Sequence, residues 1–180
     1  MTLTPRLHKF ALTAHVAASV GWLGSVAVFL ALAIAGLTSR DIQRVQSAYL
    51  AMDLITWSVI VPLSFASLLT GLIQSLGTVW GLFRHYWVLV KFLITILASI
   101  LLLVHTRPIG ILAGAARETT MSGADVGRLQ IQVLADAGLA LLALLVATTL
   151  SIYKPRGLTL YGWRKQQEQR TVSPGEDAAS

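Results

Sequence analysis

Five ionisable side chains interrupt the long apolar runs of this 180-residue sequence: His15, Asp53, Lys91, His105 and Asp136. Hydrocarbon penalises each of them unless it reaches water, finds a partner or binds a ligand. Imidazole and amine nitrogens can ligate a metal or a cofactor, and carboxylates can bind hard cations. The chain has no cysteine, which excludes disulfides, thiolate metal sites and covalent haem attachment through CxxCH. A metal or cofactor would therefore depend on His, Lys, Met, carboxylates or amides.

Four apolar runs carry these residues, at about 11–37, 48–78, 86–105 and 129–153, and each reaches the ~20 residues of a bilayer-spanning helix. Hydrophobic residues make up 55% of the chain and charged residues 12%, with a mean hydropathy of +0.70. This composition is typical of a membrane protein. We expect an all-α fold, a four-helix transmembrane bundle in residues 1–160, followed by a polar, disordered cytoplasmic tail in residues 161–180.

Two local features refine this expectation. Pro62 lies midway along the second run, where it should kink the helix and free a carbonyl. The longest connection, 107–128, contains an apolar stretch at 109–113 that is expected to lie at the membrane interface.

The net charge of +6 is distributed unevenly between the two sides of the expected membrane. Basic residues concentrate on the side of the two termini, and the other side also carries acidic residues. The positive-inside rule therefore places both termini in the cytoplasm of a multi-pass protein of the bacterial cytoplasmic (inner) membrane. We interpret the basic tail as a contact with anionic lipid, so the expected partner is the lipid bilayer and not nucleic acid.

The polar residues of the spans fall into two layers. His15 and Trp22 are seven residues apart and share a helix face, as do Arg84, Lys91 and His105. At ~1.5 Å per residue, His15, Gln74 and Lys91 lie roughly 6–8 Å from the cytoplasmic side. On the same scale Asp53, His105 and Asp136 lie about 3–9 Å from the other side.

Each of these residues also has an ordinary structural interpretation. Lys91 could extend its amine to the membrane surface, and His15 could simply hydrogen-bond a neighbouring helix. Asp53 and Asp136 could bond backbone or remain protonated, and His105 could lie at the interface. The shared depth within each layer favours two common sites.

The stretch HVAASVGWLG at residues 15–24 resembles an uncharacterised family of bacterial four-span integral membrane proteins, and the similarity continues through GLIQSLGTVWGLFRHYWVLVKFLIT at 71–95. The histidine followed by Trp-x-Gly is also similar to the membrane domain of CopD-type copper-resistance proteins. His15 with Trp22, and WVLVK with the later His105, resemble HemJ-type protoporphyrinogen oxidases. The HemJ resemblance implies a four-helix membrane protein that binds haem b through His15 and Lys91.

Three functions follow as hypotheses. The first is haem b binding between spans one and three by His15 and Lys91, beside Trp22, with Arg84 or Lys91 meeting the propionates. This would serve electron transfer or a membrane oxidoreductase, with a redox partner or as a homo-oligomer. The second is a metal-ion or proton pathway at Asp53, His105 and Asp136, as the CopD resemblance implies. The third is a non-catalytic accessory subunit whose polar residues only fix helix packing.

Overall fold

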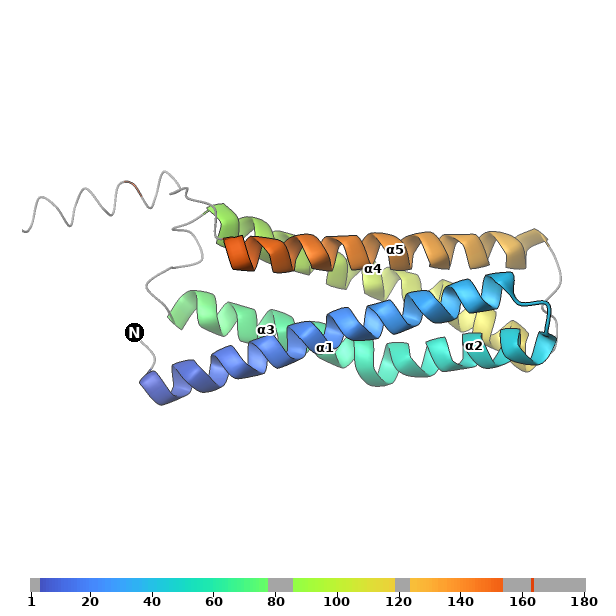
Figure 1. Ribbon diagram of the computed structural model, residues 1–180, viewed down its shortest axis with the longest axis horizontal. Coiled ribbons are helices and arrows are strands. Elements are labelled where there is room, and N and C mark those ends of the chain that lie inside the picture. The colour runs from blue at the N-terminus through green and yellow to red at the C-terminus, as the bar shows by residue number, and fades with distance from the viewer. Residues whose placement is uncertain (1–3, 78–85, 119–123, 154–162, 164–180) are drawn as a thin grey trace, which may run out of the picture.

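The computed structural model describes residues 4–77, 86–118, 124–153 and 163, and these residues are helical almost throughout, with no strand among them. Its elements in chain order are α1 (Pro5–Thr38), α2 (Ile42–Ile55), a π-helical turn η1 (Thr56–Ile60), α3 (Val61–Gly77), α4 (Tyr86–Arg117) and α5 (Ala124–Tyr153). Because α2, η1 and α3 follow one another without a break, the chain forms four long rods packed side by side (Figure 1). All four are long and apolar enough to cross a membrane. The predicted four-helix transmembrane bundle is confirmed.

Residues at the helix starts explain where two of the spans begin. Pro5 occupies the first turn of α1, where its missing N–H costs nothing and its fixed backbone angle suits a helix. Asp41 caps α2, because its carboxylate accepts the backbone N–H of Gln43 at 3.0 Å. The first two spans are therefore joined by only a short turn at residues 39–41.

The second span is interrupted by the π-helical turn directly before Pro62. The N–H of Val61 donates to the carbonyl of Thr56, five residues earlier. Pro62 has no N–H to continue the α-helical pattern, and π-helical turns commonly occur where a helix takes up one additional residue. The interruption expected at Pro62 is thus present as a widened turn.

The expectation that 107–128 lies outside the spans is wrong for most of its length. Helix α4 continues through Pro108 to Arg117, and α5 begins at Ala124. Ile109, Leu112 and Ala116 recur every three or four residues and are buried in the core of the bundle, which is the pattern of a helix face. Because this segment contains charged residues, the sequence did not indicate that the helix extends beyond the apolar run.

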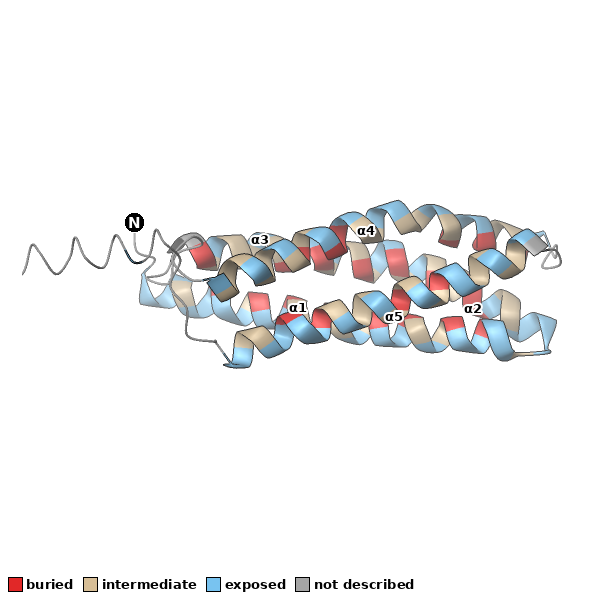
Figure 2. Cartoon of the chain, turned by 90° about the horizontal axis from the view of Figure 1, so that it is seen from above, coloured by how far each residue is buried: buried red, intermediate tan, exposed pale blue. Residues whose placement is uncertain are grey.

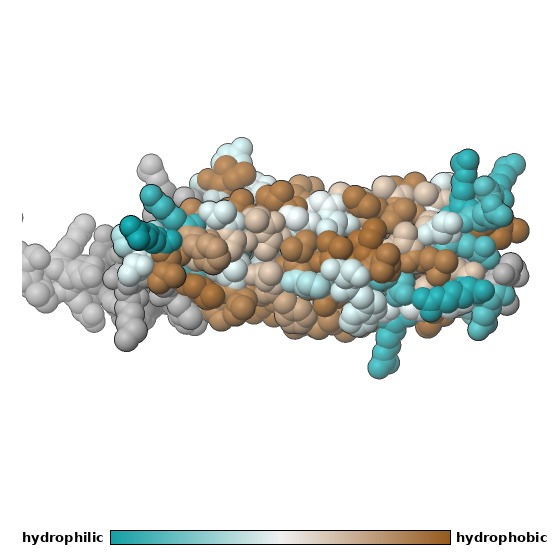
Figure 3. Space-filling model, turned by 90° about the horizontal axis from the view of Figure 1, so that it is seen from below, coloured by the Kyte–Doolittle hydropathy of each residue, from teal (hydrophilic) through white to brown (hydrophobic). Residues whose placement is uncertain are grey.

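Buried residues line the inward faces of the helices, and exposed residues face outward (Figure 2). Along α1 the buried positions repeat every three or four residues, at Ala11, His15, Ala18, Trp22, Val26, Phe29 and Ala33. Many large apolar side chains are nevertheless exposed, among them Val20 at 62% and Leu54 at 66%. On the face shown in Figure 3, hydrophobic side chains cover the middle of the bundle and hydrophilic ones gather towards its ends. Lipid around the middle explains this distribution.

The beginning of α1 and the ends of α3 and α5 lie at the same end of the bundle (Figure 1), here called the N-terminal end. The positive-inside argument predicts that this end faces the cytoplasm.

Fusion of a cytoplasm-active reporter after Ser180 should give an active protein, and fusion of a periplasm-active reporter at the same place should not. A reversed result would overturn this orientation. A fusion at Glu118, at the opposite end, should give the opposite pattern and is the control.

Candidate functional site

His15 and Lys91 meet in the interior of the bundle, near its N-terminal end. His15 lies on α1 and is only 8% exposed. Its Nε2 lies 3.3 Å from Nζ of Lys91 on α4. The predicted convergence of these two side chains is confirmed, and Lys91 reaches His15 in place of the membrane surface.

The other ring nitrogen of His15 fixes its orientation. Nδ1 lies 3.1 Å from the carbonyl oxygen of Ser67 and 3.1 Å from Oγ1 of Thr70, both on α3. A carbonyl only accepts hydrogen bonds, so Nδ1 must donate and therefore carries the ring proton. In the neutral ring Nε2 is then an unprotonated nitrogen that faces Lys91.

Two features of α3 beside this imidazole were not predicted from the sequence. Gly71 lies against the ring, and a Cβ atom there would come within 3.1 Å of Cε1 of His15. Oγ of Ser67 also lies 2.9 Å from Oγ of Ser19 on α1, which ties the two helices together next to the histidine. The recurrence of Ser64, Ser67, Gly71 and Ser75 every three or four residues is the sequence signal that could have identified this face.

A cavity of about 570 Å³ lies beside this pair and is bordered by all four spans; we call it the large cavity. Its walls combine apolar side chains with polar ones, including His8, His15, Gln74 and Lys91. No Asp or Glu is among the described residues that line it. Nε2 of Gln74 is buried and has no hydrogen-bond partner within the described part of the chain. The cavity therefore offers nitrogen atoms and hydrogen-bond donors without a competing carboxylate.

Trp22, one of the predicted cofactor-binding residues, lies deeper in the bundle. It is 3% exposed and lines both the large cavity and a second, smaller one. Its indole nitrogen is buried without a hydrogen-bond partner among the described residues. Arg84, the other residue expected to contact a cofactor, lies outside the residues that the structure describes.

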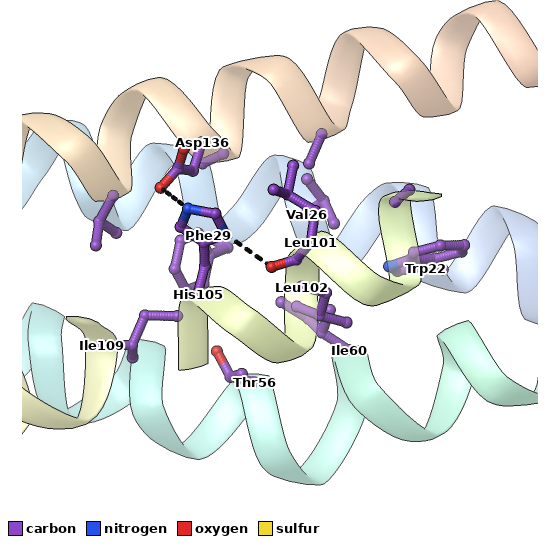
Figure 4. Close-up of a pocket in the computed structure, with 14 residues that line it drawn as sticks. Trp22, Val26, Phe29, Thr56, Ile60, Leu101, Leu102, His105, Ile109 and Asp136 are labelled. Atoms are coloured by element: carbon purple, nitrogen blue, oxygen red, sulfur yellow. Dashed lines mark hydrogen bonds and ion pairs between the residues drawn. The ribbon is translucent and has the colours of Figure 1, made fainter. Parts of the chain in front are cut away.

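The smaller cavity, of about 60 Å³, contains the His105–Asp136 pair (Figure 4). Nε2 of His105 on α4 lies 3.0 Å from Oδ2 of Asp136 on α5. Nδ1 of His105 lies 2.7 Å from the carbonyl oxygen of Leu101, one turn earlier. The side chain of His105 is therefore directed into the bundle.

Asp53 does not join this pair, contrary to the prediction of a three-residue metal site. Its Oδ2 lies 3.4 Å from Nη2 of Arg117, at the opposite end of the bundle from His15. Within residues 4–77, 86–118 and 124–153, no three His, Asp or Glu side chains come close enough to hold a metal ion. Asp53 has a cationic partner because α4 continues to Arg117, which the sequence interpretation had placed in a loop.

His105 and Asp136 are each 12 residues from the nearer end of their helices, at Arg117 and Ala124. At 1.5 Å per residue this is roughly 18 Å from the helix end. The pair therefore lies near the middle of these two helices, and its predicted depth in the membrane stays a prediction.

Comparison of the chain with protein-family models, with curated proteins and with solved structures finds no match. The resemblances to CopD-type and HemJ-type proteins thus remain predictions. The function of the site has to be argued from its own geometry.

Proposed function

We propose that this protein binds haem b in the large cavity and serves in electron transfer or as an oxidoreductase of the bacterial cytoplasmic membrane. One observation carries the proposal. An unprotonated imidazole nitrogen from α1 and an amine nitrogen from α4 converge at 3.3 Å on the wall of a cavity of about 570 Å³. Two nitrogen ligands from different helices are what a membrane bundle needs to hold an iron porphyrin.

The hydrogen bonding of His15 supports its role as a ligand. Histidines that bind metals almost always donate their second ring N–H to a carbonyl or carboxylate, which fixes the tautomer and the orientation of the ring. His15 has this arrangement, because Nδ1 donates to the Ser67 carbonyl and leaves Nε2 unprotonated, 3.3 Å from Nζ of Lys91.

The composition of the large cavity also fits the ligand. Its volume falls within the roughly 300–1,000 Å³ of small-molecule sites, and its walls contain no described carboxylate. Lys91 and Gln74 could donate to propionate groups, which pair well with cations and N–H donors. A haem bound there would supply reversible one-electron chemistry. His15 would hold the iron, and Lys91 would either ligate it or neutralise a propionate.

An absorption spectrum tests the proposal directly. Protein purified in detergent from haem-sufficient cells, or mixed with hemin afterwards, should show a Soret band that shifts on reduction with dithionite. The band should elute with the protein during size-exclusion chromatography. A protein that remains colourless after both treatments would contradict the proposal.

Replacement of Lys91 separates the two possible roles of its amine. We expect the Lys91 amine, which lies 3.3 Å from the nitrogen that would ligate iron, to separate from it and act as the second ligand. Lys91→Ala and Lys91→Arg should then both retain haem but shift the Soret and visible bands, since a guanidinium keeps the charge and does not ligate iron. An unchanged spectrum in Lys91→Arg, with weaker haem binding in Lys91→Ala only, would show that Lys91 acts as a cation.

A further inference from the structure

The His105–Asp136 pair lies in an unusual place for two ionisable side chains. Both residues are mostly buried, with side chains 19% and 25% exposed, and both are near the middle of their spans. Breaking a buried pair or leaving it charged is costly in hydrocarbon. The other described residues that line the small cavity are apolar except for Thr56 and the indole N–H of Trp22.

Other ionisable groups do not compensate the charge of this pair. The described walls of the small cavity are otherwise Trp22, Val26 and Phe29 from α1, Thr56 and Ile60 from the second span, and uncharged residues of α4 and α5. Asp53 on the second span and Arg117 on α4 neutralise each other at 3.4 Å. The pair is therefore neutral only when Nε2 of His105 or the Asp136 carboxyl group carries one proton besides the one on Nδ1.

The geometry of His105 determines where this proton can exchange. Nδ1 donates to the carbonyl of Leu101 at 2.7 Å, so its hydrogen is held by a strong backbone acceptor. Protons can reach the ring only at Nε2, where it meets Asp136 (Figure 4). An imidazole that relays protons along a chain needs both nitrogens free to exchange. His105 is consequently suited to storing a proton and not to conducting one through its ring.

The small cavity provides access for water to this position. Its volume of about 60 Å³ exceeds the roughly 10–15 Å³ needed for one water molecule. Nε1 of Trp22, a buried donor without a partner among the described residues, lines the same cavity. Trp22 also borders the large cavity, so its side chain forms part of the wall of both cavities.

We propose that His105 and Asp136 form a binding site for one proton near the middle of helices α4 and α5, loaded through water in the small cavity. In the loaded state Nε2 carries the proton as part of an imidazolium, 3.0 Å from Oδ2 of Asp136, and the pair has no net charge. Release of the proton leaves neutral His105, still protonated at Nδ1, beside the Asp136 carboxylate. The proposal does not depend on haem binding, because every contact in it belongs to the small cavity.

Solid-state NMR of the full chain in lipid bilayers tests this site. The sequence has only 4 histidines, so ¹⁵N-histidine labelling gives few signals, and His105 is assigned by its loss in His105→Gln. Over a pH titration, Nε2 of His105 should change in one step together with the ¹³C signal of the Asp136 carboxyl carbon. The Nδ1 signal should stay that of a protonated nitrogen throughout.

Variants provide the controls. Asp136→Asn should move the midpoint of the Nε2 step by at least about one pH unit, which is a tenfold change in proton affinity. Asp53→Asn removes the carboxylate that pairs with Arg117 and should leave the titration step of Nε2 in place. The proposal is overturned if the wild-type Nε2 signal does not titrate while the protein stays folded, if Nδ1 loses its hydrogen in the step, or if Asp136→Asn leaves the midpoint unchanged. Once the His105 signal is assigned, the wild-type titration can overturn the proposal without Asp136→Asn.

Discussion

Replacing His15 by Ala is expected to abolish haem binding. The substitution removes the Nε2 atom that faces the large cavity and leaves Lys91 without its neighbour at 3.3 Å. Loss of groups that merely orient a metal ligand weakens binding by about 10–100-fold, so loss of the ligand itself should exceed that range. Hemin titration, followed by the Soret band and by quenching of tryptophan fluorescence, measures the change.

His8→Ala is the matched control for this experiment. His8 lies on the same helix, lines the same cavity and is more exposed than His15. We expect His8→Ala to keep the wild-type Soret band. If His15→Ala keeps the band, His15 is not the ligand. If His8→Ala also loses the band, the loss is not specific to His15 and does not identify it as the ligand. Both variants should be compared at equal amounts of monodisperse protein, so that misfolding is not mistaken for loss of the ligand.

Gly36→Ala is expected to lower the free energy of unfolding by roughly 1–3 kcal/mol, the usual cost of overpacking a core. A Cβ atom at Gly36 would lie 2.8 Å from Cζ and 2.9 Å from Oη of Tyr49. Tyr49 is only 1% exposed, so its ring has little space into which it can move. Unfolding in mixed micelles of increasing SDS content, followed by circular dichroism, measures the difference.

Gly24→Ala is the comparison for Gly36→Ala, because it makes the same chemical change on the same helix. Apart from its chain neighbours and the adjoining backbone of α1, no atom of the described residues lies within 4 Å of the position that its Cβ would occupy. This variant should be unchanged or slightly more stable, since alanine in a helix is favoured over glycine by about 0.5–1 kcal/mol. Equal unfolding transitions for the two variants would show that the contact between α1 and Tyr49 is not tight.

The fold was largely predictable because the bilayer dictates it. An apolar run of sufficient length has few structural alternatives to a spanning helix, and all four spans were identified in this way. The helix ends were not, because Arg107, Arg117 and Arg128 end the apolar pattern while the backbone remains helical. The same error concealed the Asp53–Arg117 contact.

Of the candidate site, only the meeting of the His15 and Lys91 side chains could be predicted from the sequence. Helical spacing and depth were enough to bring His15 and Lys91 together, because both residues are costly in lipid unless they meet a partner. The Ser67 carbonyl that orients His15 is a backbone atom, and every residue has one. Gly71 contributes because it has no Cβ atom, which leaves space for the His15 ring on another helix. Both contributions depend on how α1 and α3 pack, which no pattern within a single helix determines.

The π-helical turn has a consequence for insertions and deletions in the second span. Met52, Thr56, Ile60 and Ser64 are four residues apart, and none is more than 2% exposed. In a regular α-helix each step of four residues turns the side chain by about 40°, so three steps would move Ser64 about 120° from the face of Met52. The π-helical turn compensates this rotation with its one additional residue, so Ser64 stays on the buried face of the span. Removal of one residue between Thr56 and Ile60 would restore the regular period and rotate Ser67 and Gly71 about 100° away from His15. Related chains that keep the His15 site should therefore vary in residue type along this segment but keep its number of residues.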